Sequence, residues 1–237
     1  MKPAKISRKI IGPLGWQEFS GGNWLRAEEQ VMLDRYLPKI FGFYMLKLGH
    51  LSGQMDGHHS MIRKQVCIAP SIATQDIVAE LTALPIQESS VDLCLLNHTL
   101  DFSDDPHQIL REVERVLTQD GYLILSGFNP MSLMGIRAHL GRRRIIPWSC
   151  QMFTPMRVRD WLNLLGFEVL HDERYAFTGF TNSQPLGSWF EQKGRLYARP
   201  FSSCYLMVAR KRTVPLTPIR QKWQLKKTIA VRPLASS

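Results

Sequence analysis

The chain has 237 residues, of which 44% are hydrophobic and 10% aromatic, and these proportions exclude an intrinsically disordered protein. No apolar stretch approaches the roughly 20 residues that a membrane-spanning helix needs, and Gly12 and Pro13 interrupt the basic N-terminus before an apolar run of signal-peptide length. We therefore expect a cytoplasmic protein with one main domain.

The net charge of +10 is concentrated at the C-terminal end of the chain. Eleven basic residues and no acidic residue follow Glu191, so residues 1–191 hold 19 basic and 20 acidic residues and are nearly neutral. We expect an extended basic leader over residues 1–22, a folded domain over 23–211 and a flexible basic tail over 212–237. The tail surrounds Trp223 with basic residues, which suits RNA backbone contact with stacking, but also a nonspecific solubilising or anchoring segment.

The elements of the domain follow one another in a regular order. The segment after Asn23, which is a good N-cap, has Leu25, Met32 and Tyr36 on one face and predicts a helix that ends before Pro38. The predicted buried strands cover residues 43–49, 65–70, 91–97 and 122–128, and two late strands cover 167–177 and 204–210.

Two further helices are predicted with their caps. In residues 103–117, Ser103 to Asp105 can cap the helix, Pro106 suits its first turn, and the apolar positions that follow form one buried stripe. Residues 154–166 begin with Thr154 and Pro155 and end at Gly166. Strands that alternate with amphipathic helices predict a doubly wound, mostly parallel α/β sheet with helices on both faces, and the two late strands suggest an antiparallel edge.

The stretch from Glu80 to Pro130 resembles the class I S-adenosylmethionine-dependent methyltransferases of the type 11 branch. It holds an acidic residue ahead of Leu84-Pro85, the triplet Ser90-Val91-Asp92 that opens a strand, and the sequence Arg115-Val116-Leu117 ahead of a glycine turn. The resemblance implies a Rossmann-like methyltransferase fold, a sheet of seven strands with the last strand inserted antiparallel, and the cofactor S-adenosylmethionine at the carboxyl ends of the first strands.

The resemblance also implies site residues. Glu80 would accept a hydrogen bond from the adenine amino group, and Asn97 and His98 would lie beside the reacting methyl group as catalytic candidates. The cofactor-binding residues expected on this basis are Gly49, Gly53, Glu80, Leu81 and Asn97. A base is needed only where the acceptor must lose a proton.

The chain departs from the family pattern in its first half. Aligned on Gly49 and Gly53, it has Lys47 where the family has an acid and Leu51 where it has the middle glycine. Lys47 would place a cation near a positively charged ligand, and Leu51 would project towards the ligand or reroute the turn. The end of the second strand offers only Ser71 in place of the ribose-binding acid. The segment between Val66 and Glu80 has too few residues for the usual helix, turn and third strand.

Other polar clusters allow two interpretations each. Arg137, Arg142, Arg143 and Arg144 fall in a stretch that often forms the substrate lid in this family, and they suit an anionic small molecule, a phosphate or RNA, or else form a solvated loop. Asp101, Asp104 and Asp105 suit an amine substrate but also helix capping. His58-His59 lacks partners with metal-ligand spacing, so we expect a loop and no metal site.

The sequence therefore favours a methyltransferase with an acceptor that it does not define. The alternatives are a catalytically silent protein of the same fold that acts by binding, and an RNA-binding protein that uses the arginine-rich stretch and the tail.

Overall fold

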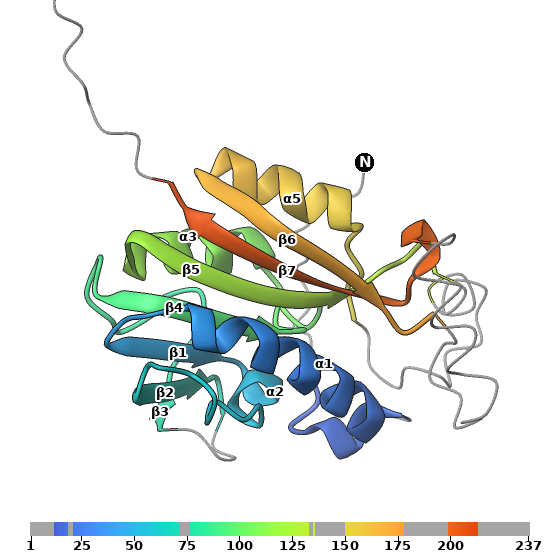
Figure 1. Cartoon of the computed structure of the whole chain (residues 1–237), viewed down its shortest axis with the longest axis horizontal. Coiled ribbons are helices and arrows are strands. Elements are labelled where there is room, and N and C mark those ends of the chain that lie inside the picture. Colours follow the sequence, from blue (N-terminus) through green and yellow to red (C-terminus); the bar gives the residue numbers. More distant parts are fainter. Residues whose placement is uncertain are drawn as a thin grey trace, which may run out of the picture.

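The computed structural model describes residues 12–18, 21–71, 76–132, 135, 150–177 and 199–212. One sheet of seven strands organises them, with the order β3-β2-β1-β4-β5-β7-β6 (Figure 1). All neighbouring pairs are parallel except those of β7, which runs antiparallel to both β5 and β6. The predicted mostly parallel sheet with an inserted antiparallel last strand is confirmed. The strands are β1 (Tyr44–Leu48), β2 (Lys64–Ala69), β3 (Ile77–Val78), β4 (Val91–Asn97), β5 (Leu117–Phe128), β6 (Phe167–Tyr175) and β7 (Cys204–Lys211).

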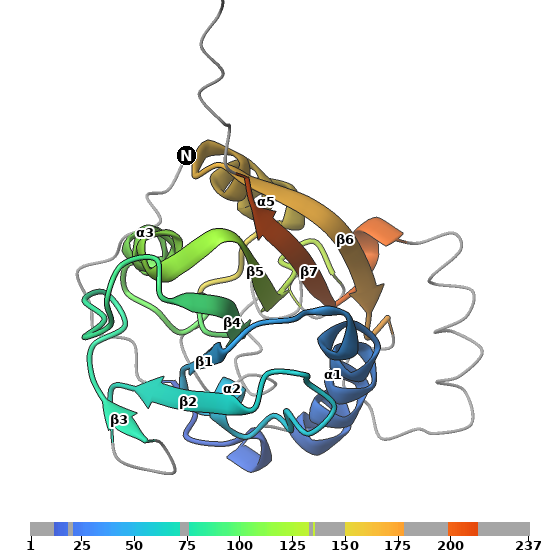
Figure 2. The same cartoon turned by 60° about the vertical axis from the view of Figure 1, so that its left-hand side comes forward.

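Helices cover both faces of the sheet, as Figures 1 and 2 show. The helix α1 (Gly22–Tyr36) packs on one face, where its apolar side chains join those of β1, β4 and β7 in one hydrophobic cluster. The helices α3 (Pro106–Val116) and α5 (Pro155–Leu164) cover the other face with a second cluster. The short helix α2 (His50–Gly53) follows β1, and 3-10 turns lie at Trp16–Glu18, Leu37–Lys39 and Arg199–Phe201. No described helix is long and apolar enough to cross a membrane.

The start of α1 differs from the prediction. Asn23 lies inside the helix, and the N-cap is Gly21, whose φ of 75° is in the left-handed region that glycine adopts without strain. Asn23 was therefore wrong as the cap. Backbone geometry, which the sequence pattern does not report, decides where this helix begins.

The region between β2 and β4 is short, as expected. β3 has only two residues, which pair with Ile68 and Ala69 of β2. Asp76 ties the segment to β2, because its backbone N–H donates to the Cys67 carbonyl and its carboxylate accepts from the Cys67 N–H at 2.8 Å. The edge of the sheet on this side is thus thin, and it leaves the ends of β1 and β2 accessible from one side.

β5 begins five residues earlier than predicted, at Leu117. Asp120 has a φ of 63°, as a turn requires, but Leu117 ahead of that turn already pairs with Val91. The pairing of β4 with β5 shifts in register between Val91 and Leu93. β5 therefore continues through the residues that the sequence indicated as a turn, with an irregularity at that point.

The cap of α3 gives a test of the local analysis. The Asp105 carboxylate accepts a hydrogen bond from the Gln108 N–H at 3.1 Å. We expect Asp105→Ala to lower the free energy of unfolding by about 1 kcal/mol, because one N–H of the first turn loses its partner. Urea denaturation measures this change. Asp104→Ala, which leaves the cap in place, is the control, and an equal loss in both variants would contradict the assignment.

Candidate functional site

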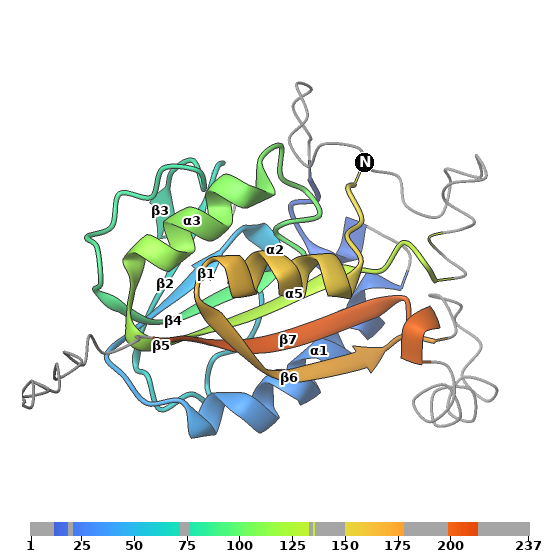
Figure 3. The ribbon, with the colours of Figure 1, turned by 90° about the horizontal axis from the view of Figure 1, so that it is seen from above.

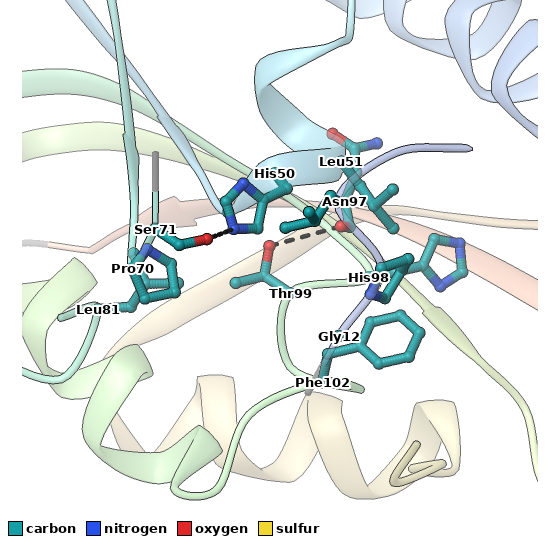
Figure 4. A pocket seen from close by; sticks show the side chains of 13 residues that line it. Gly12, His50, Leu51, Pro70, Ser71, Leu81, Asn97, His98, Thr99 and Phe102 are labelled. Atoms are coloured by element: carbon teal, nitrogen blue, oxygen red, sulfur yellow. Dashed lines mark hydrogen bonds between the residues drawn. The ribbon is translucent and has the colours of Figure 1, made fainter. Parts of the chain in front are cut away.

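A cavity of about 260 Å³ lies at the carboxyl ends of β1, β2 and β4 (Figure 4). The segment from Gly12 to Leu14 closes one side of it, and Gly12 packs so closely on Phe102 that a Cβ at Gly12 would lie 2.9 Å from the Phe102 Cβ. A more open hollow of about 650 Å³ adjoins the cavity, and Pro70, Leu81, Thr99 and Phe102 line both. The two spaces together form one elongated site along the carboxyl ends of the strands.

The turn after β1 forms part of the cavity wall. Gly49 has a φ of 91°, and a Cβ there would lie 3.0 Å from the Thr99 Oγ1, so both the backbone and the space favour glycine. Leu51 also lines the cavity and is buried, and its carbonyl accepts a hydrogen bond from the Trp16 indole N–H at 3.0 Å. The branched side chain therefore faces the ligand space, which was one of the two outcomes expected for it.

Gly53 and Lys47 do not line the cavity. A Cβ on Gly53 would lie 2.5 Å from the Cys67 Sγ, so this glycine allows α2 to pack on β2. The Lys47 ammonium donates to the Met55 carbonyl at 2.8 Å, and burial lowers its pKa. The expectation that Lys47 would place a cation beside the ligand was wrong, because its side chain is held by the segment that follows α2.

The segment after β2 and the start of α2 contribute a polar pair. The Ser71 hydroxyl and the His50 Nε2 are 3.0 Å apart, and both residues line the cavity (Figure 4). Ser71 thus stands where the family pattern has a carboxylate. Glu80 lines the adjoining hollow, and Leu81 lies between the two spaces. Among the described residues, the only carboxylates that line either space are those of Glu80, Asp104 and Asp105 in the hollow.

Asn97, the last residue of β4, presents a buried amide in the cavity wall. Its Nδ2 donates to the Glu29 carboxylate at 2.5 Å, and its backbone N–H donates to the Ser52 hydroxyl at 2.7 Å. Its Oδ1 is buried and has no hydrogen-bond partner within the described part of the chain. A buried acceptor without a partner is costly, so this atom is a natural place for a donor group of a ligand.

Glu29 is the centre of a buried polar network that the sequence analysis missed. It is fully buried, and its carboxylate accepts hydrogen bonds from Asn97, Ser126 and Tyr175 and contacts the His98 Nε2 at 2.7 Å. The signal was present in the sequence, because Glu29 lies on the same helical stripe as Leu25, Met32 and Tyr36, where a carboxylate needs buried partners.

His98 lies between two carboxylates and is itself fully buried. Its Nε2 faces Glu29 at 2.7 Å, its Nδ1 faces Asp101 at 2.8 Å, and its ring packs on Phe128 with centroids 4.0 Å apart. Both nitrogens therefore donate, and the ring is an imidazolium. Its φ of 53° is in the left-handed region, where a residue other than glycine is under strain and the surrounding contacts must hold it.

The network has perturbed proton affinities. Burial alone would lower the pKa of His98, but the two carboxylates outweigh it and raise the pKa to about 9. Burial raises the pKa of Asp101 to about 6 against the opposing effect of His98. Burial also acts to raise the pKa of Glu29, yet the imidazolium and the hydrogen-bond donors hold that pKa below its ordinary value.

The remaining predicted residues are distributed differently. Arg137, Arg142, Arg143 and Arg144 lie outside the described residues. The three predicted aspartates have different surroundings. Asp101 belongs to the buried network, whereas Asp104 and Asp105 line the hollow, and Asp105 also caps α3. His59 contacts the Asp34 carboxylate at 3.1 Å, and the described residues contain no cluster of side chains suited to a metal ion.

Comparisons with known proteins agree with this geometry. A family described as "Methyltransferase domain" matches residues 44–125. The uncharacterized protein YafS of Escherichia coli is 38% identical over 227 residues, which cover 93% of this chain and 91% of YafS.

Solved structures share the fold at low sequence identity. A SAM-dependent methyltransferase from Archaeoglobus fulgidus superposes with a TM-score of 0.57 at 14% identity and covers 78% of this chain and 94% of its own. The [4+2]-cyclase SpnF superposes with a TM-score of 0.56 at 15% identity over 79% of this chain and 81% of its own.

The chain belongs to one family with YafS, its residues 44–125 match the methyltransferase domain, and its fold is that of the S-adenosylmethionine-dependent methyltransferases. The cofactor of methyltransferases with this fold, such as the archaeal one, is S-adenosylmethionine, and three features of the site fit it. The cavity is already formed at the strand ends, Gly49 lets the backbone approach a ligand closely, and Asn97 contributes a buried polar side chain to the wall.

The raised pKa of His98 gives a testable pH dependence. Its imidazolium contributes stability that is fully present below the ordinary pKa of 6.5 and is lost as the pH rises through about 9. We expect the free energy of unfolding to fall over this range in the native protein. In His98→Gln this fall should disappear, and the variant should be less stable by about 3–5 kcal/mol at pH 6.5 because the Glu29 carboxylate loses its counter-ion.

Urea denaturation at a series of pH values measures this dependence. His59→Gln, a substitution at a half-exposed site, serves as the control and should keep the native slope. A flat native profile between pH 6.5 and 9 would show that His98 is neutral in the fold.

Proposed function

We propose that the protein transfers the methyl group of S-adenosylmethionine to an acceptor, and that it binds this cofactor in the cavity at the carboxyl ends of β1, β2 and β4. The observation that carries the proposal is the preformed cavity at the strand ends, whose wall holds Gly49 and the buried side chain of Asn97. The sulfonium of the cofactor supplies a reactive methyl group, so the protein mainly has to align the acceptor and exclude water.

Six residues would hold the cofactor. The Asn97 Oδ1 would accept from its ammonium group, because no described carboxylate lines the 260 Å³ cavity. Gly49 would let the main chain approach it, Glu80 would accept from the adenine amino group, and Leu81 would pack on the base. The His50–Ser71 pair at the end of β2 would take the place of the acid that the family uses for the ribose hydroxyls.

Glu29 would act as a positioning residue in this arrangement. Its carboxylate accepts from the Asn97 Nδ2, which fixes the amide so that Oδ1 remains the free end. His98 would not serve as a general base, because both ring nitrogens donate to carboxylates and neither has a lone pair for a proton. Its role would be to neutralise Glu29 from its own position in the cavity wall.

The acceptor is proposed from the sequence. Four arginines follow the carboxyl end of β5 in the sequence: Arg137, Arg142, Arg143 and Arg144. Their guanidinium groups would suit an anionic small molecule or an RNA phosphate. The segments that connect β5 to α5 and β6 to β7 both leave the sheet at this end.

A second candidate is a catalytically silent protein that binds a ligand in the same cavity. Two observations favour it: Gly12, Pro13 and Leu14 form one wall of the cavity, and the described ends of β1 and β2 carry no acid that faces it. The similarity to SpnF, a cyclase with this fold, also illustrates that the fold alone does not fix the reaction.

Cofactor titration tests the proposal. We expect isothermal titration calorimetry of the purified protein to show binding of S-adenosylmethionine and S-adenosylhomocysteine. Glu80→Ala should weaken both by about tenfold, because a charge-assisted hydrogen bond to the base is lost. Glu88→Ala, at an exposed carboxylate outside the site, should bind as the native protein does. Absence of binding by the native protein would refute the proposal, and binding without methyl transfer to any acceptor would favour the silent candidate.

The role of Asn97 has a separate test. Asn97→Leu keeps the approximate volume of the side chain but removes the acceptor. We expect it to weaken binding of S-adenosylhomocysteine by about tenfold and to leave binding of 5′-methylthioadenosine, which lacks the amino-acid part, unchanged. An equal loss for both ligands would mean that the substitution disturbs the whole cavity, and would contradict a contact with the ammonium group. Thermal denaturation of the variant checks that it folds.

A further inference from the structure

Exposed aromatic side chains gather at the amino end of β1, at the end of the sheet opposite to the cavity. Phe41 is 71% exposed, Phe43 is 80% exposed and Tyr44 is 43% exposed. Met61, three residues ahead of β2, is 59% exposed. The register that pairs Tyr44 with Lys64 brings the starts of β1 and β2 together. Three exposed rings within four residues form a cluster, unlike the single apolar residues that are common on protein surfaces.

The fold holds these rings outward. The Asp92 carboxylate accepts hydrogen bonds from the Phe43 N–H at 2.6 Å and the Tyr44 N–H at 3.0 Å. Gly42 lies so close to Asp92 that a Cβ would come within 2.3 Å of the Asp92 Cβ, and Ile40 is buried in the core. The backbone of this loop is therefore fixed on both sides of Phe41, and the aromatic rings cannot fold back into the core without breaking these contacts.

Basic side chains surround the aromatic cluster. Lys39, Arg63 and Lys64 are exposed, and the Lys64 ammonium lies 5.4 Å from the centroid of the Tyr44 ring. The stretches 37–44 and 60–64 contain no acidic residue. The nearby Asp92 carboxylate is already engaged by the backbone of the loop. This surface, defined by Lys39, Phe41, Phe43, Tyr44, Met61, Arg63 and Lys64, is called the amino-edge patch below.

The last described strand, β7, finishes at the same end of the sheet. β7 runs antiparallel to β5 and finishes at Lys211, whose ammonium donates to the carbonyls of Glu114 and Leu117 at the start of β5. Figures 1 and 3 show the start of β1 and the end of β7 at the same end of the sheet. The 26 residues from Arg212 onward hold six basic residues and no acidic residue.

We propose that the amino-edge patch docks on the surface of an anionic lipid bilayer. Aromatic rings favour the headgroup level of a bilayer, and basic residues beside them are attracted by anionic lipids. Stable attachment needs two such signals together, which the patch and the basic tail that follows β7 in the sequence provide. A protein partner fits less well, because the cores of protein interfaces are depleted of lysine.

This orientation has a consequence for the site. The cavity lies at the carboxyl ends of the strands, whereas the amino-edge patch lies at the start of β1, so a docked molecule keeps its cavity on the side away from the lipid. Attachment would then concentrate the protein at the membrane without blocking access to the cavity. The proposal does not depend on methyl transfer.

Co-sedimentation with lipid vesicles tests the proposal on the full chain. We expect the protein to sediment with vesicles of phosphatidylcholine and phosphatidylglycerol and to bind phosphatidylcholine alone much less. The double variant Phe41→Ser, Phe43→Ser should partition at least about tenfold less, because two exposed rings no longer enter the interface. Met156→Ser, at a 76% exposed apolar position on α5, is the matched control and should partition as the native protein does. Circular dichroism confirms that both variants fold.

Three results would overturn the proposal. The first is equal binding to neutral and anionic vesicles, or to neither. The second is unchanged partition of the double variant. The third is a different occupant, which would show itself as a dimer that dissociates in the double variant, or as binding to a nucleic acid without binding to vesicles.

Discussion

The carboxylate of Glu29 is the buried charge that the arrangement of this site depends on. It lies in α1 on one face of the sheet, and its partners come from β4, β5 and β6, so it ties the N-terminal helix to three strands. A fully buried carboxylate is stable only when charged and hydrogen-bonded partners surround it. His98 supplies the opposite charge, and Asp101 on the far side of the ring holds the other ring nitrogen at 2.8 Å.

The same network shapes the cavity. Because Glu29 takes the Nδ2 of Asn97, the amide presents Oδ1 as an acceptor, and because His98 donates from both nitrogens, it is unsuited to remove a proton. The buried carboxylates of Glu29 and Asp101 thus lie outside the lining of the cavity, whereas His98 and the amide of Asn97 belong to it. That arrangement suits a reaction in which the leaving group is already good and alignment matters more than acid–base chemistry.

The sequence predicted the order and type of most elements, because the strands appear as short apolar runs and the helices as apolar residues at helical spacing. The boundaries of β4 and the start of α3 agree with the prediction, whereas the cap of α1 and the start of β5 do not. Of the candidate site residues, Gly49, Leu81, Asn97 and His98 line the cavity, and Glu80 lines the adjoining hollow. Gly53 lies away from it because its lack of a side chain serves the packing of α2 on β2.

The sequence by itself determined the fold, because periodicity, caps and the run from Glu80 to Pro130 are local properties of the chain. Only the tertiary structure decided the composition of the site. Glu29 and His98 are 69 residues apart, and Glu29 and Tyr175 are 146 apart, so no local pattern relates them. The direction of the Lys47 side chain was equally undecided, since a strand residue can face either side of a sheet and only the segment after α2 shows where its ammonium group is held.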